Sequence, residues 1–149
     1  MSSMFSYDPQ AQYEVRKFDV LYQKALGQPW EATIYQPEGD GPFPAILFVH
    51  GGAWNAGTRT GQDIFNTGLA SSGMVVASID FRLAPDHPYP AQVEDTSYAI
   101  RWLKAHASEF NASPDSIGGF GSSSGGHTLM LAAMRPDGPS VSRSLVSRR

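Results

Sequence analysis

The chain has 149 residues, a formal net charge of −3 and a hydrophobic content of 41%, which is enough apolar surface for one core. This mild acidity offers no basic surface to nucleic acid or to an anionic membrane, so neither is expected as a partner. The absence of cysteine excludes disulfides, thiolate metal sites and cysteine nucleophiles.

The first half of the chain contains patterns for three strands and one helix. A weak alternation of apolar and polar residues predicts a strand at residues 18–22. A second strand is expected at 30–35, closed by the proline- and glycine-rich turn at 37–42. The continuous apolar run at 44–49 is typical of a strand buried on both faces of a parallel sheet. A helix is expected at 62–70, ended by the Ser-Gly pair that follows it.

The second half continues the alternation of strands and helices. The apolar run at 74–79 predicts a fourth buried strand, and the strongest helical periodicity covers 91–107. A loop is expected at 111–115, a short strand at 117–120 and a last helix at 128–134. Strands that alternate with helices in this way indicate an α/β layered sheet.

A serine between glycines follows the last predicted strand. Residues 121–125 read Gly-Ser-Ser-Ser-Gly and fit G-x-S-x-G, in which a serine sits on a tight turn between a strand and a helix. Only Ser123 has glycine two residues away on both sides, so Ser123 is the predicted nucleophile. Gly121 and Gly125 are expected because a Cβ at either position would clash with the crowded turn. The N–H of Ser124 then lies at a helix N-terminus, where developing negative charge is favoured.

A second glycine-containing segment, His50-Gly51-Gly52-Ala53-Trp54, follows the third predicted strand. Glycines allow backbone N–H groups to face a substrate carbonyl without obstruction by side chains. Such an oxyanion-stabilising loop is typical of lipases and esterases at this place in the chain. Each donor of an oxyanion hole contributes about 3–4 kcal/mol to stabilising the transition state.

Four motifs taken together resemble a known family. HGGAW, DFRLAPDHPYP at 80–90, VED at 93–95 and GSSSGGH at 121–127 are similar to hormone-sensitive-lipase-like and related short-chain esterases of the α/β-hydrolase superfamily. The resemblance covers roughly residues 30–136. It implies the N-terminal half only of an α/β-hydrolase fold, with a mostly parallel sheet flanked by helices.

The resemblance also implies roles for single residues. Ser123 would attack a carboxylic ester and form an acyl-enzyme. Gly52, Ala53 and Ser124 would donate N–H groups to the oxyanion, while Gly51 would shape the loop.

Four further residues have expected roles outside the oxyanion hole. Arg82 and Asp95 match family positions where an ion pair would join the loop after the fourth strand to the next helix. His50 is expected to hydrogen-bond within its own loop rather than to act as a base. Trp54 either lines the acyl pocket or is buried in the core.

The acid and the histidine of a catalytic triad do not follow Ser123 in the usual order. In this fold the chain order is serine, acid, histidine, but only Asp137 and His127 come after Ser123. His127 lies one turn along the helix that Ser123 precedes, so we expect a structural role for it. We therefore expect a truncated, impaired enzyme, with 1–138 as part of a single domain and 139–149 as an irregular Ser/Arg-rich tail.

Two alternatives stay open beside the esterase. An arylformamidase-like amide hydrolase would carry a similar HGG-aromatic loop, and a non-catalytic fragment would act as an interaction module or have no function. The expected partners are a small-molecule ester and, through an exposed sheet edge, further copies of the chain. No cofactor or metal is expected. No secretory leader or membrane-length apolar run is visible, so we expect a cytoplasmic location.

Overall fold

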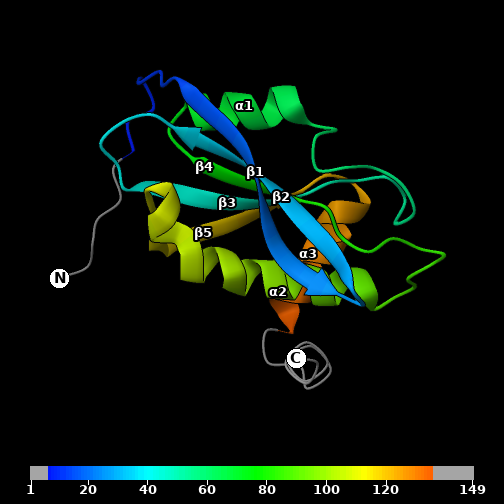
Figure 1. Ribbon diagram of the computed structural model, residues 1–149. Coiled ribbons are helices and arrows are strands. Elements are labelled where there is room, and N and C mark those ends of the chain that lie inside the picture. The colour runs from blue at the N-terminus through cyan, green and yellow to red at the C-terminus, as the bar shows by residue number, and fades with distance from the viewer. Residues whose placement is uncertain (1–6, 136–149) are drawn as a thin grey trace.

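Five strands form one mixed sheet in the computed structural model, which describes residues 7–135 (Figure 1). The strands are β1 (Val15–Ala25), β2 (Gln28–Pro37), β3 (Phe43–Val49), β4 (Val75–Ile79) and β5 (Ala112–Gly121). The helices are α1 (Asp63–Ser71), α2 (Ala91–His106) and α3 (Ser124–Met134), with a short 3₁₀ helix, Ala107–Phe110, after α2.

The strand order in the sheet is β1-β2-β4-β3-β5. The pairs β4–β3 and β3–β5 are parallel, whereas β1–β2 and β2–β4 are antiparallel, so only β2 runs against the other strands. In the parallel part, β3 and β5 end together with Val49 opposite Gly121. Loops that leave the carboxyl ends of neighbouring parallel strands meet at one edge of the sheet, which is where ligands bind in open α/β sheets.

Helices cover both faces of the sheet (Figure 1). On one face α1 packs against Tyr35, Phe48 and Val76 through Ala70. On the other face α2 and the 3₁₀ turn pack on the larger core, to which Leu103 and Phe110 contribute; the remaining buried members come mainly from β2, β3 and β4. Layers of this kind identify an α/β fold and confirm the predicted fold class.

The predicted strands and helices are confirmed, but the prediction of a loop at 111–115 is mostly wrong. Residues from Ala112 onward belong to β5, although the pairing with β3 is irregular there. Phe43 lies opposite Ala112 and Ala45 lies opposite Ile117, so the residues between them bulge out of the ladder. Pro114 lies in this bulge and has no N–H to donate to a neighbouring strand.

Helix α3 begins at Ser124, four residues before the predicted start at 128. Gly125 and Gly126 weaken the sequence pattern because glycine has a low helix propensity. The close packing of this helix against the end of β3, described below, outweighs that preference.

The predicted tail at 139–149 lies outside the described residues. Among residues 7–135, no helix combines the length and the apolar character needed to cross a bilayer.

Candidate active site

Ser123 lies on a sharp turn between β5 and α3. Its backbone has φ 52° and ψ −120°, a conformation that non-glycine residues rarely adopt. The N–H of Ser122 donates to the carbonyl of Val49 at 3.1 Å, and the N–H of Gly125 donates to the carbonyl of Ser122 at 2.8 Å. These bonds hold the turn at the carboxyl end of β3. Strain of this kind is common at functional sites, where the surrounding structure maintains it.

The two glycines that flank Ser123 lie where a side chain would collide with backbone. A Cβ on Gly125 would be 2.1 Å from the carbonyl oxygen of Val49, and a Cβ on Gly121 would be 2.4 Å from the nitrogen of Gly126. Both contacts are far shorter than any real Cβ contact. The glycines therefore allow α3 to begin directly against β3, with the Ser123 side chain exposed to solvent.

The loop after β3 lies beside this turn. A Cβ on Gly51 would be only 3.2 Å from the Cβ of Ser123. Gly52 and Ala53 both have positive φ, and the carbonyl of Gly52 accepts the N–H of Ala56 at 3.0 Å. The N–H of Trp54 donates to the hydroxyl of Ser124 at 3.3 Å. The structure thus brings Gly51, Gly52, Ala53 and Ser124 together around Ser123.

Several backbone donors of this region have no acceptor within residues 7–135. The N–H groups of Gly52, Ala53 and Ser124 donate no hydrogen bond to the described part of the chain. Backbone N–H groups in folded proteins are nearly always paired. Unpaired donors beside an exposed serine are the arrangement that stabilises a developing oxyanion in acyl transfer.

Two cavities open on either side of Ser123. One has a volume of about 320 Å³ and is lined by a mixture of glycine and polar side chains, among them His50, Thr58 and Gln62. The other has a volume of about 520 Å³ and is lined by Ala53, Trp54, Ser123, Ser124 and His127. Ser123 is the residue common to both cavities, so its hydroxyl is reachable from two directions.

His50 and Trp54 lie at the two ends of the HGGAW segment. His50 is buried, its Nδ1–H donates to the carbonyl of Gly51 at 2.7 Å, and its ring stacks on Phe81 at 4.4 Å. This confirms that His50 hydrogen-bonds within its own loop. Trp54 is 41% exposed, so the alternative of core burial is wrong. Its ring meets that of His127 edge-on at 5.6 Å.

The predicted ion pair between Arg82 and Asp95 is confirmed. Arg82 Nη2 lies 2.8 Å from Asp95 Oδ1, and the backbone N–H of Arg82 donates to Asp95 Oδ2 at 2.8 Å. Burial alone would lower the pKa of Arg82, but the bonds and charges of Asp95 and Glu94 outweigh it and raise this pKa. Gln23, which the sequence did not single out, also donates to Asp95, at 2.8 Å. The pair joins the loop after β4 to α2.

Within residues 7–135, no histidine side chain is hydrogen-bonded to the side chain of Ser123; His127 only donates its backbone N–H to the Ser123 carbonyl, at 3.3 Å. His127 lines the same cavity as Ser123, yet no hydrogen bond joins their side chains. The one histidine–carboxylate pair of the described residues, His106 with Glu109, lies at the far end of α2. The described site therefore combines an exposed serine and unpaired backbone N–H groups, and no histidine side chain is bonded to that serine.

Comparison with known proteins agrees with this geometry. The sequence model of the BD-FAE family matches residues 33–145. A probable carboxylic ester hydrolase of Mycobacterium tuberculosis, LipM, is 37% identical over 100 residues, which is 66% of this chain and 23% of LipM. The carboxylic ester hydrolase LipN of the same organism is 42% identical over 98 residues, covering 64% of this chain and 26% of LipN.

Solved esterase structures share the fold. A bacterial heroin esterase superposes with a TM-score of 0.76 at 29% identity, covering 81% of this chain and 39% of the esterase. A hyperthermophilic esterase from the archaeon Pyrobaculum calidifontis gives a TM-score of 0.74 at 33% identity, covering 80% of this chain and 38% of that enzyme. The chain thus spans about a quarter of the length of the curated relatives named above. It belongs to the BD-FAE family and is a hormone-sensitive-lipase-like member of the α/β-hydrolase superfamily.

Proposed function

We propose that this chain is the nucleophile-bearing part of a serine carboxylic-ester hydrolase that acts through an acyl-enzyme. One observation carries the proposal: Gly52, Ala53 and Ser124, whose N–H groups are unpaired, line the same two cavities as the exposed Ser123. The carboxylic ester hydrolases among its relatives support the same reaction.

The reaction would proceed in two steps. The Ser123 oxygen attacks the ester carbonyl carbon, and the carbonyl oxygen becomes an oxyanion that accepts hydrogen bonds from the three free N–H groups. Cleavage of the ester bond then releases the alcohol, which takes up the proton lost by the serine. Water attacks the acyl-enzyme in the same way, releases the carboxylic acid and restores the hydroxyl of Ser123.

We propose that the chain of 149 residues carries out this reaction slowly. Assistance by a general base, such as the histidine of a triad, typically raises the reaction rate about 10²–10⁴-fold. The described residues place no base on Ser123. Binding and an oxyanion hole alone still leave a residual catalysis of about 10³-fold over water.

Hydrolysis of p-nitrophenyl acetate tests the proposal. We expect a slow release of p-nitrophenol above the buffer rate, lost in Ser123→Ala and kept in the matched control Ser122→Ala. The rate should lie at least about a hundredfold below the roughly 10 s⁻¹ of an ordinary enzyme. A Ser123→Ala variant as active as the wild type would refute the nucleophile. Turnover near 10 s⁻¹ that depends on Ser123 would instead show that a base is present.

The two alternatives predict other results in the same assay. An arylformamidase-like enzyme would cleave formanilide, the formamide of aniline, faster than the acetate ester, and this cleavage would also depend on Ser123. A non-catalytic interaction module would release no product above the buffer rate with either substrate. The donors around Ser123 favour a hydrolase over the module.

A further inference from the structure

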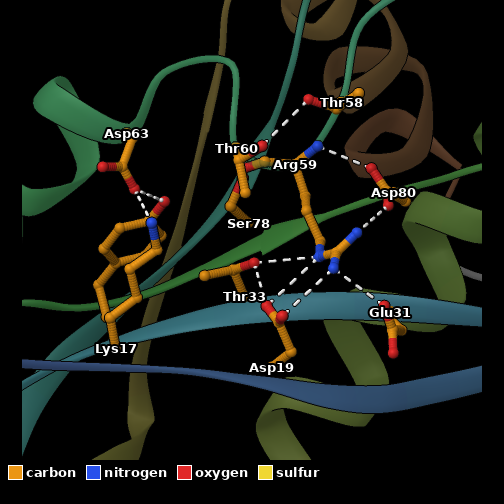
Figure 2. A network of polar contacts seen from close by, with 11 residues as sticks. Lys17, Asp19, Glu31, Thr33, Thr58, Arg59, Thr60, Asp63, Ser78 and Asp80 are labelled. Carbon is orange, nitrogen blue, oxygen red and sulfur yellow. Dashed lines mark hydrogen bonds and ion pairs between the residues drawn. The ribbon is translucent and has the colours of Figure 1, made fainter.

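Arg59 lies in the loop that carries the oxyanion donors, and it is the centre of a polar cluster that no sequence motif indicated. The cluster consists of Arg59 with the residues that bond it: Asp19, Glu31, Thr33, Ser78 and Asp80 (Figure 2). Its members come from the loop after β3, from β1, β2 and β4, and from the residue directly after β4. Through its side chain and its backbone, one residue thus connects the loop to three strands.

Both backbone groups of Arg59 are bonded to the sheet. Its N–H donates to Asp80 Oδ1 at 2.7 Å, and its carbonyl accepts the hydroxyl of Ser78 at 2.6 Å. Asp80 also receives the guanidinium, through Nη1 at 2.5 Å. A single carboxylate therefore fixes the backbone and the side chain of the same residue, which leaves this point of the loop little freedom to move.

The other guanidinium nitrogens point toward β1 and β2 (Figure 2). Nε donates to the Thr33 hydroxyl at 3.1 Å, while Nη2 lies 2.9 Å from a Glu31 oxygen and 3.3 Å from an Asp19 oxygen. Burial alone would lower the pKa of Arg59, but the bonds to Asp19 and Asp80 outweigh it and raise this pKa. The planar fork of arginine makes bonds in several directions that the point charge of lysine does not reproduce.

Gly57 packs against the first residues of the HGGAW segment. Gly57 is two residues before Arg59 and packs so tightly that a Cβ would lie 2.4 Å from both the Gly51 carbonyl oxygen and the His50 Nδ1. Gly57 therefore lies directly behind the backbone of Gly51, which is itself next to Ser123. A displacement at residue 59 would loosen this contact and release the loop from the turn.

We propose that Arg59 is a positioning residue for the oxyanion hole: it holds the loop against the end of β4 so that Gly52 and Ala53 stay aimed at the substrate carbonyl. The expected effect of Arg59 on catalysis rests on the proposed ester hydrolysis, whereas its effect on the position of the loop does not. Preorganised donors are effective only when they are held at the place where the oxyanion forms.

Hydrogen exchange followed by mass spectrometry tests the structural part on the full chain. In Arg59→Gln we expect the hydrogen-bonded amides of this loop, those of Trp54, Asn55 and Ala56, to exchange at least about tenfold faster, because locally opening loops exchange through small free-energy barriers. The amides of β3 and α2 should be unchanged. The matched control is Arg16→Gln, which removes an exposed arginine of β1 that forms no ion pair within the described residues.

Kinetics with p-nitrophenyl acetate test the catalytic part. Losing one oxyanion donor costs roughly 10²–10³-fold in kcat, so loosening the donors should lower the Ser123-dependent kcat of Arg59→Gln by about tenfold or more. KM should change less than about threefold, because the donors act on the transition state rather than on the bound ester. Arg59→Lys, which keeps the charge and loses the fork, should lie between the wild type and Arg59→Gln in both measurements.

Two results would overturn the inference. One is an Arg59→Gln variant that matches Arg16→Gln in loop exchange and in kcat. The other is exchange that becomes faster to the same extent in the loop, β3 and α2, which would mean that Arg59 stabilises the whole fold rather than the loop. If Arg59→Gln does not fold, the same comparison is made with Arg59→Lys. Absence of Ser123-dependent hydrolysis in the wild type would refute the proposed function, and the exchange measurement would still decide whether Arg59 holds the loop.

Discussion

Three adjacent serines have different surroundings, although they are chemically identical. Ser123 is exposed at the positive-φ position of the turn, whereas Ser124 is buried as the first residue of α3. The hydroxyl of Ser124 accepts the N–H of Trp54, and its own N–H stays free. Ser124 therefore connects the HGGAW segment to the turn through its side chain, and its backbone N–H stays unpaired.

Ser124→Ala separates these two roles. The variant keeps the backbone donor and loses a hydrogen bond of 3.3 Å, which is typically worth about 1 kcal/mol. We expect the Ser123-dependent rate on p-nitrophenyl acetate to fall roughly fivefold, since 1.4 kcal/mol corresponds to a factor of 10. Ser122→Ala is the control. A Ser124→Ala rate equal to that of Ser122→Ala would show that the hydroxyl does not hold the loop.

Asp19 gives a pH-dependent test of the Arg59 cluster. The hydrogen bond from Thr33, followed by that from Arg59, lowers the pKa of Asp19 below its ordinary value of 3.8. A carboxylate whose pKa is lowered by folding stabilises the protein above its unfolded pKa, and this stabilisation disappears as the pH falls through the folded pKa.

We therefore expect Asp19→Asn to unfold at a lower temperature than the wild type at pH 6. The difference should begin to shrink below about pH 4, where Asp19 of the unfolded wild type takes up a proton, and disappear as the pH falls through the lower pKa of the folded state. Thermal unfolding between pH 2.5 and 6 measures this. A difference that stays constant over this range would mean that Asp19 does not contribute through its charge.

At the scale of elements, the buried pair of Arg82 and Asp95 connects the loop after β4 to the first turns of α2. Asp95 is fully buried and is bonded by the backbone and the guanidinium of Arg82 and by Gln23. Removing one partner of a buried ion pair typically costs about 3–5 kcal/mol. Without Asp95, the Arg82 guanidinium would keep only Glu94, at 3.2 Å, and the backbone N–H of Arg82 and the side chain of Gln23 would lose their acceptor.

Asp95→Ala should accordingly lower the free energy of unfolding by about 3–5 kcal/mol, most of the stability of a typical domain. Urea titration followed by circular dichroism measures the loss. Asp86→Ala, an exposed aspartate in the same loop, is the matched control and should change stability by less than about 0.5 kcal/mol. A loss below about 1 kcal/mol in Asp95→Ala would show that the pair does not stabilise α2.

Elements with strong local patterns could be predicted from the sequence. The apolar runs of β3 and β4 and the periodicity of α2 give boundaries within a few residues of those observed. The sequence predicts only residues 117–120 of β5, because the bulge around Pro114 hides the first residues of this strand. The sequence predicts too late a start for α3, because Gly125 has a low helix propensity. Packing of Gly125 against Val49 determines where this helix begins.

The candidate site divides in the same way. Ser123 and the HGGAW loop are local motifs, so the sequence was sufficient to single them out. The Arg59 cluster joins residues as far apart as Asp19 and Asp80, none of which lies in a motif for ion pairing. Long-range polar contacts of this kind depend on the strand order, which a single sequence does not specify.

At the scale of the whole molecule, one sheet edge is open in the described residues. Within residues 7–135, β5 has a strand on one side only. Beside it lies a cavity of about 440 Å³ lined by apolar side chains such as Ile117, Leu129 and Met130. Met130 and Met134 are 64% and 73% exposed. An unpaired strand next to exposed apolar side chains is a template for pairing with another chain.

We expect the protein of 149 residues to self-associate through this edge and to unfold at a low temperature. Size-exclusion chromatography with light scattering and thermal unfolding measure both properties. Met130→Lys, on the exposed side of α3, should reduce this association. Gly119→Lys on β5 is less suitable, because its Cβ would press on Leu129 and perturb folding. A monodisperse wild-type monomer that unfolds sharply above about 50 °C, in the usual mesophile range, would contradict the expectation.

If Ser123 is the nucleophile of an ester hydrolase, as we propose, a fluorophosphonate should modify this serine covalently. The protein is incubated for several hours with a fluorophosphonate, digested and mapped by tandem mass spectrometry. We predict a single adduct, on Ser123, that is absent in Ser123→Ala and unchanged in Ser122→Ala. An adduct on Ser122 or Ser124, or labelling that persists in Ser123→Ala, would contradict the claim.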